Sequence, residues 1–138
     1  MGYILKVDGV GTLGVETIQT VNFSVDTPKD SNARTTDVAV SLKITGKILT
    51  LLDGGTEASK DLAAWAMTPA EQANCYRNVV LTATAAGQVI REYTLPNAFV
   101  VDYRENYGDT EGVGTFRLVV RQKKDKINVT TVNGGYGA

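Results

Sequence analysis

The segment from Leu95 to Lys124 constrains the fold of this chain more than any other, because it predicts two long strands joined by a polar, acidic, glycine-rich loop. In the second strand, apolar and polar side chains alternate. One face carries Phe116, Leu118 and Val120, and the other carries Thr115, Arg117, Val119 and Arg121. A period of two is typical of a sheet with one buried face and one face in water. Long strands with charged outer faces favour a barrel wall or an assembly surface over a catalytic pocket.

The same reading along the rest of the chain predicts further strands before and after one helix. The expected strands are Tyr3–Asp8, Thr17–Asp26 with a bulge between Ile18 and Val21, Val38–Thr45 with an extension toward Leu51, Tyr76–Ala85, Gln88–Leu95 and a weak last strand at Ile127–Val132. Ala86-Gly87 predicts a tight hairpin turn, and Pro96-Asn97 is expected to end the strand that follows it. The glycine-rich residues 9–14 are expected to form a turn.

The predicted helix is Thr56–Met67, which contains no glycine or proline, and Leu62 and Trp65 are expected to anchor it on the sheet. A short helical turn is expected at Thr68–Glu71, where a threonine precedes a proline. Residues 27–37 form an extended polar loop, and residues 133–138 a flexible tail. Because no regular alternation of strands and helices occurs, the sequence predicts one mainly-β domain over residues 1–138. The expected architecture is a closed or nearly closed antiparallel β-barrel with one α-helix.

The composition excludes several classes of chemistry. The 138 residues include no histidine and a single cysteine. Ser-His-Asp and Cys-His catalytic arrangements are therefore ruled out, as is a zinc site built on histidine and cysteine. Cys75 has no partner for an internal disulfide, and we expect it to be a small buried residue. No cofactor and no metal site are predicted.

The charge and hydropathy of the chain bear on its partners. The net charge is −1, so we expect no nucleic-acid binding by a basic surface. No apolar run approaches the roughly 20 residues that span a bilayer, and we expect no membrane insertion. The amino-terminal segment does not read as a signal peptide. We therefore expect assembly in the cytoplasm, with any release or injection by a route that reads no signal peptide.

Carboxylates cluster around the loop of the opening segment and form the one candidate for acid–base chemistry. The cluster contains Asp102, Glu105, Asp109 and Glu111, with Arg104 and Arg117 as neighbouring salt partners. Two carboxylates could form a glycosidase pair or a calcium site. The alternative is a set of solvated charges at the rim of the fold or between subunits, together with Arg121. We favour the second interpretation and predict no enzymatic activity.

The layout of the chain resembles a known family. The opening residues YILKVDGVGTLG and the block from Arg91 to Gln122 look like the first strand and the late strands of tube-forming proteins of contractile injection machines. These are the Hcp protein of type VI secretion and the phage tail tube proteins. The resemblance implies a homo-oligomeric ring, with six copies expected, whose sheets continue around a central channel. It also implies that rings stack into a tube, with sheath, baseplate or effector proteins as further partners.

The resemblance assigns a role to the polar loop of residues 27–37, which would reach the neighbouring ring. The residues that it implies for ring stacking are Thr27, Pro28, Lys29, Asp30, Ser31, Asn32 and Arg34. Two other functions stay open on the residues alone. One is a small monomeric β-barrel module that binds a ligand or a protein, and the other is a carboxylate-based hydrolase.

Overall fold

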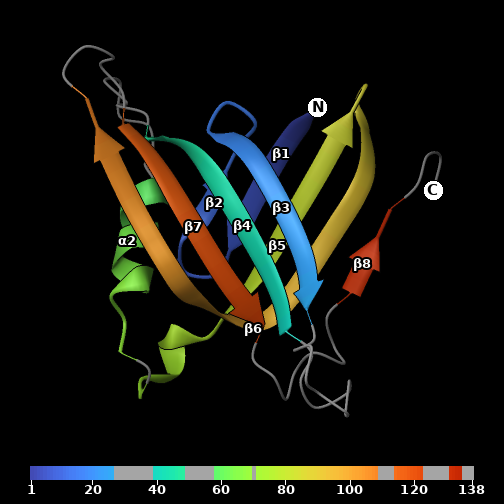
Figure 1. The fold of residues 1–138 in the computed structure, drawn as a ribbon. Coiled ribbons are helices and arrows are strands. Elements are labelled where there is room, and N and C mark those ends of the chain that lie inside the picture. Colours follow the sequence, from blue (N-terminus) through green and yellow to red (C-terminus); the bar gives the residue numbers. More distant parts are fainter. Residues whose placement is uncertain (27–38, 49–57, 70, 109–113, 123–130, 135–138) are drawn as a thin grey trace.

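The computed structural model describes residues 1–26, 39–48, 58–69, 71–108, 114–122 and 131–134. Within these ranges the chain forms one antiparallel sheet and one α-helix (Figure 1), so the predicted mainly-β antiparallel fold is confirmed. The strands are β1 (Gly2–Val7), β2 (Gly11–Leu13), β3 (Ile18–Asp26), β4 (Ala39–Ile48), β5 (Arg77–Ala85), β6 (Gln88–Tyr107), β7 (Gly114–Gln122) and β8 (Thr131–Asn133). The helices are α2 (Ala58–Ala66) and the 3₁₀ turn η1 (Ala73–Cys75).

The strands follow the order β2-β1-β5-β6-β7-β4-β3, and β8 pairs with β6. Figure 1 shows that β6 bends in its middle, so that its first half runs beside β5 and its second half beside β7. The strands β7, β4 and β3 therefore lie in front of β1, β2 and α2. The sheet therefore folds over on itself like a barrel. Among the described residues the terminal strands β2 and β3 do not pair with each other, and the barrel is open there.

The long strand β6 corrects the sequence analysis, which ended a strand at Pro96-Asn97. The chain instead continues as one strand of 20 residues. Asn97 adopts a positive φ of 58°, and its N–H donates to the side-chain oxygen of Asn78 at 3.2 Å. The buried side chain of Gln122 donates to the carbonyl of Pro96. Contacts from β5 and β7 thus stabilise a bend in β6, at a position where local sequence propensity predicts the end of a strand.

The first turn and the helical turn also differ from the sequence analysis. Residues 11–13 pair with β1 as a short strand, where only a turn was expected. The helical turn lies at Ala73–Cys75, later than predicted, and the Thr68 hydroxyl donates back to the carbonyl of Ala64. The predicted bulge after Ile18 is present as a register shift before Thr20. Residues 49–57 and 123–130, where parts of a predicted strand and of the helix fall, lie outside the described residues.

The core fills the space between the two halves of the folded sheet. Leu5, Leu42, Ile44, Leu81 and Leu118 have no exposed surface, and they come from the four strands β1, β4, β5 and β7. Helix α2 adds Leu62 and Trp65, which are 0% and 2% exposed. The apolar faces predicted from alternation therefore meet in one cluster. No helix within the described ranges has the length and apolar character that crossing a membrane requires.

Candidate assembly surface and polar pocket

The second half of β6 forms a four-stranded layer with β7, β4 and β3, and this layer has two open edges. Strand β5 pairs with β6 only as far as Ala98. Beyond Ala98, the side of β6 that faces away from β7 is therefore next to no other strand among the described residues. At the other end, β3 pairs with β4 alone. Open edges present backbone groups that can pair with another chain.

Apolar side chains are exposed beside both edges. A groove of about 340 Å³ runs between α2 and β6, lined by Ala63, Ala66, Met67, Val100, Val101, Asp102 and Tyr103. In this groove Met67 is 76% exposed and Val101 is 44% exposed. Near the end of β3, Val25 is 45% exposed. The two edges thus combine apolar surface with a strand that lacks a second neighbouring strand in the described part of the chain, and interfaces between chains bury surface of this kind.

Of the acidic residues predicted to cluster, the structure describes two, Asp102 and Glu105, and they lie on opposite faces of β6. Asp102 is opposite Val119 on the outer face, whereas Glu105 is opposite Phe116 on the inner face. The hydroxyls of Tyr103 and Tyr107 each donate to the Glu105 carboxylate at 2.8 Å. Asp102 instead forms an ion pair with Arg104 at 3.2 Å. Asp102 and Glu105 lie on opposite faces of the same strand, so they do not form a glycosidase pair.

The remaining predicted site residues divide into two groups. Arg117 and Arg121 are exposed on the outer face of β7. Asp109 and Glu111, and the whole set of predicted ring-stacking residues from Thr27 to Arg34, lie outside the described residues.

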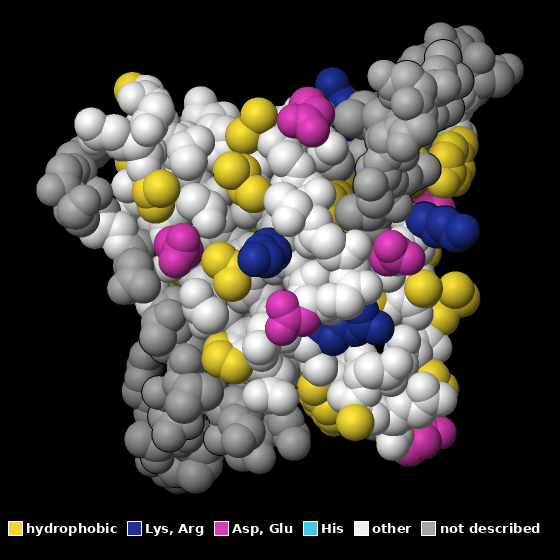
Figure 2. Space-filling model, turned by 180° about the vertical axis from the view of Figure 1, so that it is seen from behind, with side chains coloured by type: hydrophobic (Ala, Val, Ile, Leu, Met, Phe, Trp, Pro, Cys, Tyr) yellow, Lys and Arg dark blue, Asp and Glu magenta, His cyan; other side chains and the backbone are white. Residues whose placement is uncertain are grey.

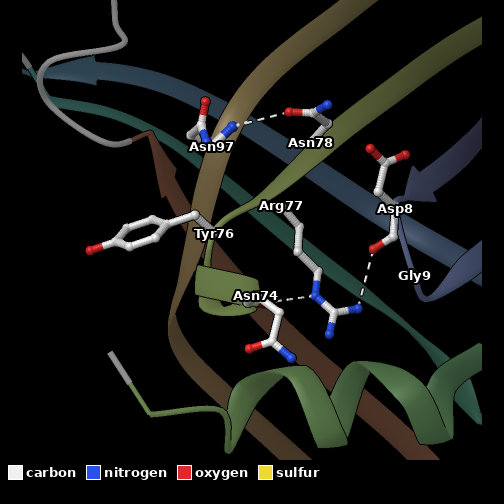
Figure 3. A pocket seen from close by; sticks show the side chains of 7 residues that line it. All are labelled: Asp8, Gly9, Asn74, Tyr76, Arg77, Asn78 and Asn97. Carbon is white, nitrogen blue, oxygen red and sulfur yellow. Dashed lines mark hydrogen bonds between the residues drawn. The ribbon is translucent and has the colours of Figure 1, made fainter. Parts of the chain in front are cut away.

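A polar pocket that the sequence analysis missed lies where three turns meet (Figure 3). Its volume is about 480 Å³, and it is lined by Asp8, Gly9, Asn74, Tyr76, Arg77, Asn78 and Asn97. These residues come from the β1–β2 turn, η1, the start of β5 and the bend of β6. No motif links such distant positions, so only the fold brings them together.

Arg77 organises the pocket. Its Nε donates to the carbonyl of Asn74 at 3.0 Å, and its NH1 donates to the carbonyl of Asp8 at 3.2 Å. The guanidinium also lies 5.9 Å from the centre of the Trp65 ring. Gly9 has a positive φ of 77°, and a Cβ there would lie 2.6 Å from NH1 of Arg77. The pocket is therefore a structural junction that leaves amide and charged groups facing solvent.

The described residues contain no group of three or more His, Cys, Asp or Glu side chains that could hold a metal ion. The pocket offers one carboxylate, one guanidinium and several amides, which suit hydrogen bonding to a polar partner.

The side of the molecule on which α2, β1 and β2 lie is mixed in charge. Figure 2 shows Lys and Arg interspersed with Asp and Glu on this side, with single apolar side chains between them. An exposed Lys6 on β1 belongs to this part of the sheet. Such mixed polarity is ordinary for a solvated surface.

Comparisons with known proteins place the fold. No protein-family model matches the sequence, and no curated protein matches it. Hcp1 from Flavobacterium johnsoniae is similar in structure, with 16% identity, a TM-score of 0.62, and coverage of 98% of this chain and 97% of Hcp1. Hcp2 from Salmonella typhimurium is 11% identical, with a TM-score of 0.58 and coverage of 97% and 94%.

A third similar structure comes from a larger complex. It is a chain of the PVC sheath–tube complex, an extracellular contractile injection system in the extended state. It is 9% identical, with a TM-score of 0.56, and the match covers 97% of this chain and 89% of that one. This protein therefore has an Hcp-like fold, which is also the fold of a chain in the sheath–tube complex of a contractile injection system.

Proposed function

We propose that this protein is a structural subunit that assembles into rings, and that the rings stack into the tube of a contractile injection apparatus. The observation that carries the proposal is the likeness of nearly the whole chain to Hcp structures and to a sheath–tube complex. The open edges of β3 and β6 supply a physical means of assembly. The resemblance to Hcp implies six copies in each ring, with sheath or baseplate proteins as further partners.

The strand directions allow the sheet to continue from one copy to the next. In the layer β6-β7-β4-β3, each neighbouring pair is antiparallel. With four strands, β3 runs opposite to the second half of β6. If β3 of one copy lies beside β6 of the next, the antiparallel alternation continues without interruption. Such a head-to-tail contact forms a closed ring when its rotation closes.

The positions of the exposed apolar residues fit the same contact. Val25 is opposite Val40. One residue along, the cross-strand partners form a row across the four strands, which consists of Ser24, Ser41, Arg121 and Phe99. Val101 follows Phe99 by two residues. The apolar surfaces of the two edges therefore lie near the same level of the layer. In the proposed ring, Val25 of one copy packs into the groove at Val101 and Met67 of the next.

The proposed contact is tested by cross-linking. Two single variants, Val25→Cys and Val101→Cys, are prepared separately, mixed, and treated with a short bismaleimide. We expect a cross-linked dimer in the mixture, little in either variant alone, and a ladder of closed and open oligomers in the double variant. The wild-type chain, which retains the buried Cys75, is the reagent control. Cross-linking no greater than in the wild type contradicts the contact.

One observation favours a second candidate function. The pocket at Arg77 presents amides and charges to solvent, which would suit a monomeric module that binds a polar ligand or peptide. This alternative predicts a chain that remains monomeric at high concentration.

A further inference from the structure

The outer face of the four-stranded layer carries a concentration of positive charge. Alternation and register place five exposed cations on this face: Lys43, Lys47, Arg104, Arg117 and Arg121. We call this set the basic face. Among the described residues, the carboxylates on the same side of the layer are Asp26, at the end of β3, and Asp102. These seven described side chains sum to a charge of +3, in a chain whose net charge is −1.

The cations lie close enough to repel one another. Arg104 and Arg117 are direct cross-strand partners. Lys43 and Lys47 are opposite Val119 and Thr115, so both are diagonal neighbours of Arg117. Like charges directly opposite each other in a sheet are destabilising, and diagonal neighbours are within reach of long side chains. In the described part of the chain, Asp102 is the one carboxylate that pairs with this set, through Arg104.

Repulsion of this kind lowers the stability of the free protein and strengthens the attraction for an anionic partner. Small polar side chains, including Thr45, Thr20 and Asn22, lie among the cations, together with the buried Val119. These groups can hydrogen-bond a carboxylate or a peptide backbone. Two guanidinium groups on adjacent strands can also bind carboxylates in a bidentate manner.

The shape of the face favours a polypeptide over a nucleic acid. Single-stranded nucleic acid is held by aromatic side chains on which bases stack, and among the outward side chains of the described layer Phe99 is the one aromatic. The major groove of a duplex admits a helix or a two-stranded ribbon, and a sheet four strands wide is broader than that. Scattered carboxylates on a flexible chain match the spread of cations better.

We propose that the basic face binds an acidic polypeptide segment. The binding does not depend on ring assembly and is a property of each copy. In the proposed ring, the basic faces of neighbouring copies would join into one continuous basic surface. Exposed ion pairs contribute little individually, so contact at several cations would hold an acidic segment while still allowing its release.

The test measures binding of a fluorescent poly-L-glutamate peptide by anisotropy, at protein concentrations where light scattering shows a single copy. We expect saturable binding that weakens as salt rises. The variant Lys43→Gln/Arg117→Gln should bind about tenfold more weakly, since each exposed pair is worth roughly 1.5- to 5-fold. The matched control Lys6→Gln/Arg91→Gln removes one lysine and one arginine from exposed positions outside the basic face and should bind like the wild type.

A second readout, the thermal midpoint of the single variant Arg117→Gln, tests whether the protein still folds and whether the cations repel one another. Arg117→Gln removes the direct partner of Arg104, so its thermal midpoint should equal or exceed that of the wild type. Four results overturn the proposal. Two of them are no binding of polyglutamate and an equal loss of binding in both double variants. A third is tighter binding of an oligothymidylate that the Lys43→Gln/Arg117→Gln variant abolishes, which would assign the face to nucleic acid. Self-association that disappears in this variant would assign it to a second copy of the chain and overturn the proposal as well.

Discussion

The indole Nε1–H of Trp65 in α2 donates a hydrogen bond to the backbone carbonyl of Cys75, at 2.8 Å and in the protein interior. The same ring has the guanidinium of Arg77 5.9 Å from its centre. One side chain therefore connects the helix, the 3₁₀ turn and the start of β5. Removing the donor to a buried carbonyl costs more than a hydrogen bond contributes on average, because the carbonyl stays buried without that donor.

The substitution Trp65→Phe should therefore lower the free energy of unfolding by about 2–4 kcal/mol, through the unsatisfied carbonyl and the space left by the smaller ring. Urea denaturation measures this change. Lys60→Ala, an exposed substitution in the same helix, should stay within about 0.5 kcal/mol of the wild type. A Trp65→Phe variant as stable as the Lys60→Ala variant would show that the hydrogen bond has no role in docking α2.

Gly9 and Gly87 form a matched pair for the Arg77 junction. Their φ values are 77° and 76°, so alanine at either position should cost about 1–2 kcal/mol for the left-handed conformation. A Cβ at Gly87 meets nothing within 4 Å, whereas one at Gly9 meets Arg77. Gly9→Ala should thus destabilise more than Gly87→Ala in thermal unfolding, because Arg77 is displaced from the carbonyl of Asp8. Equal losses would mean that the Arg77 contact contributes no stability.

The role of the groove beside α2 can be tested with two valines on β6 that are both 44% exposed, Val101 and Val89. Val101→Asp places a charge in the proposed contact between copies and should abolish ring formation in sedimentation velocity. Val89→Asp, on the first half of β6, should assemble like the wild type. Circular dichroism should show both variants folded, since each site is exposed. Loss of assembly in both variants would indicate a general effect of charge on β6 and not a contact at the groove.

The next prediction concerns the stacking of rings and the predicted polar loop of residues 27–37. Shortening it should leave the fold and the rings intact and should reduce stacking into tubes, as seen by electron microscopy. A Gly-Ser replacement of equal length separates the effect of loop chemistry from that of loop length. If the shortened chain fails to fold, the loop belongs to the core structure and the prediction is wrong.

The sequence was most informative where one local rule governs a whole strand. The alternation along β7 predicted its two faces, and the structure buries Phe116, Leu118 and Val120 and exposes Arg117 and Arg121. Val119, which was predicted on the wet face, is only 6% exposed. Residues three apart in a strand point to opposite faces, so the spacing of Asp102 and Glu105 argues against a carboxylate pair, an argument that the sequence analysis did not use.

Tertiary contacts explain what the sequence could not show. Pro96 normally ends a strand, but Gln122 and Asn78 support the bend, and both are distant in sequence. The pocket around Arg77 likewise unites turns separated by 69 residues between Arg77 and Asp8. The net charge of −1 is a sum over the whole chain, so it gave no sign of the basic face. Only the register of β7 against β4 on one side and β6 on the other reveals that five cations share one surface.

The central claim is that this chain forms rings, and native mass spectrometry combined with negative-stain electron microscopy tests it most directly. We predict one dominant species whose mass is an integer multiple of 14.8 kDa, with six copies expected, and images of rings with a central channel. A single species of 14.8 kDa at high protein concentration, with no rings on the grid, would contradict the account and favour a monomeric binding module.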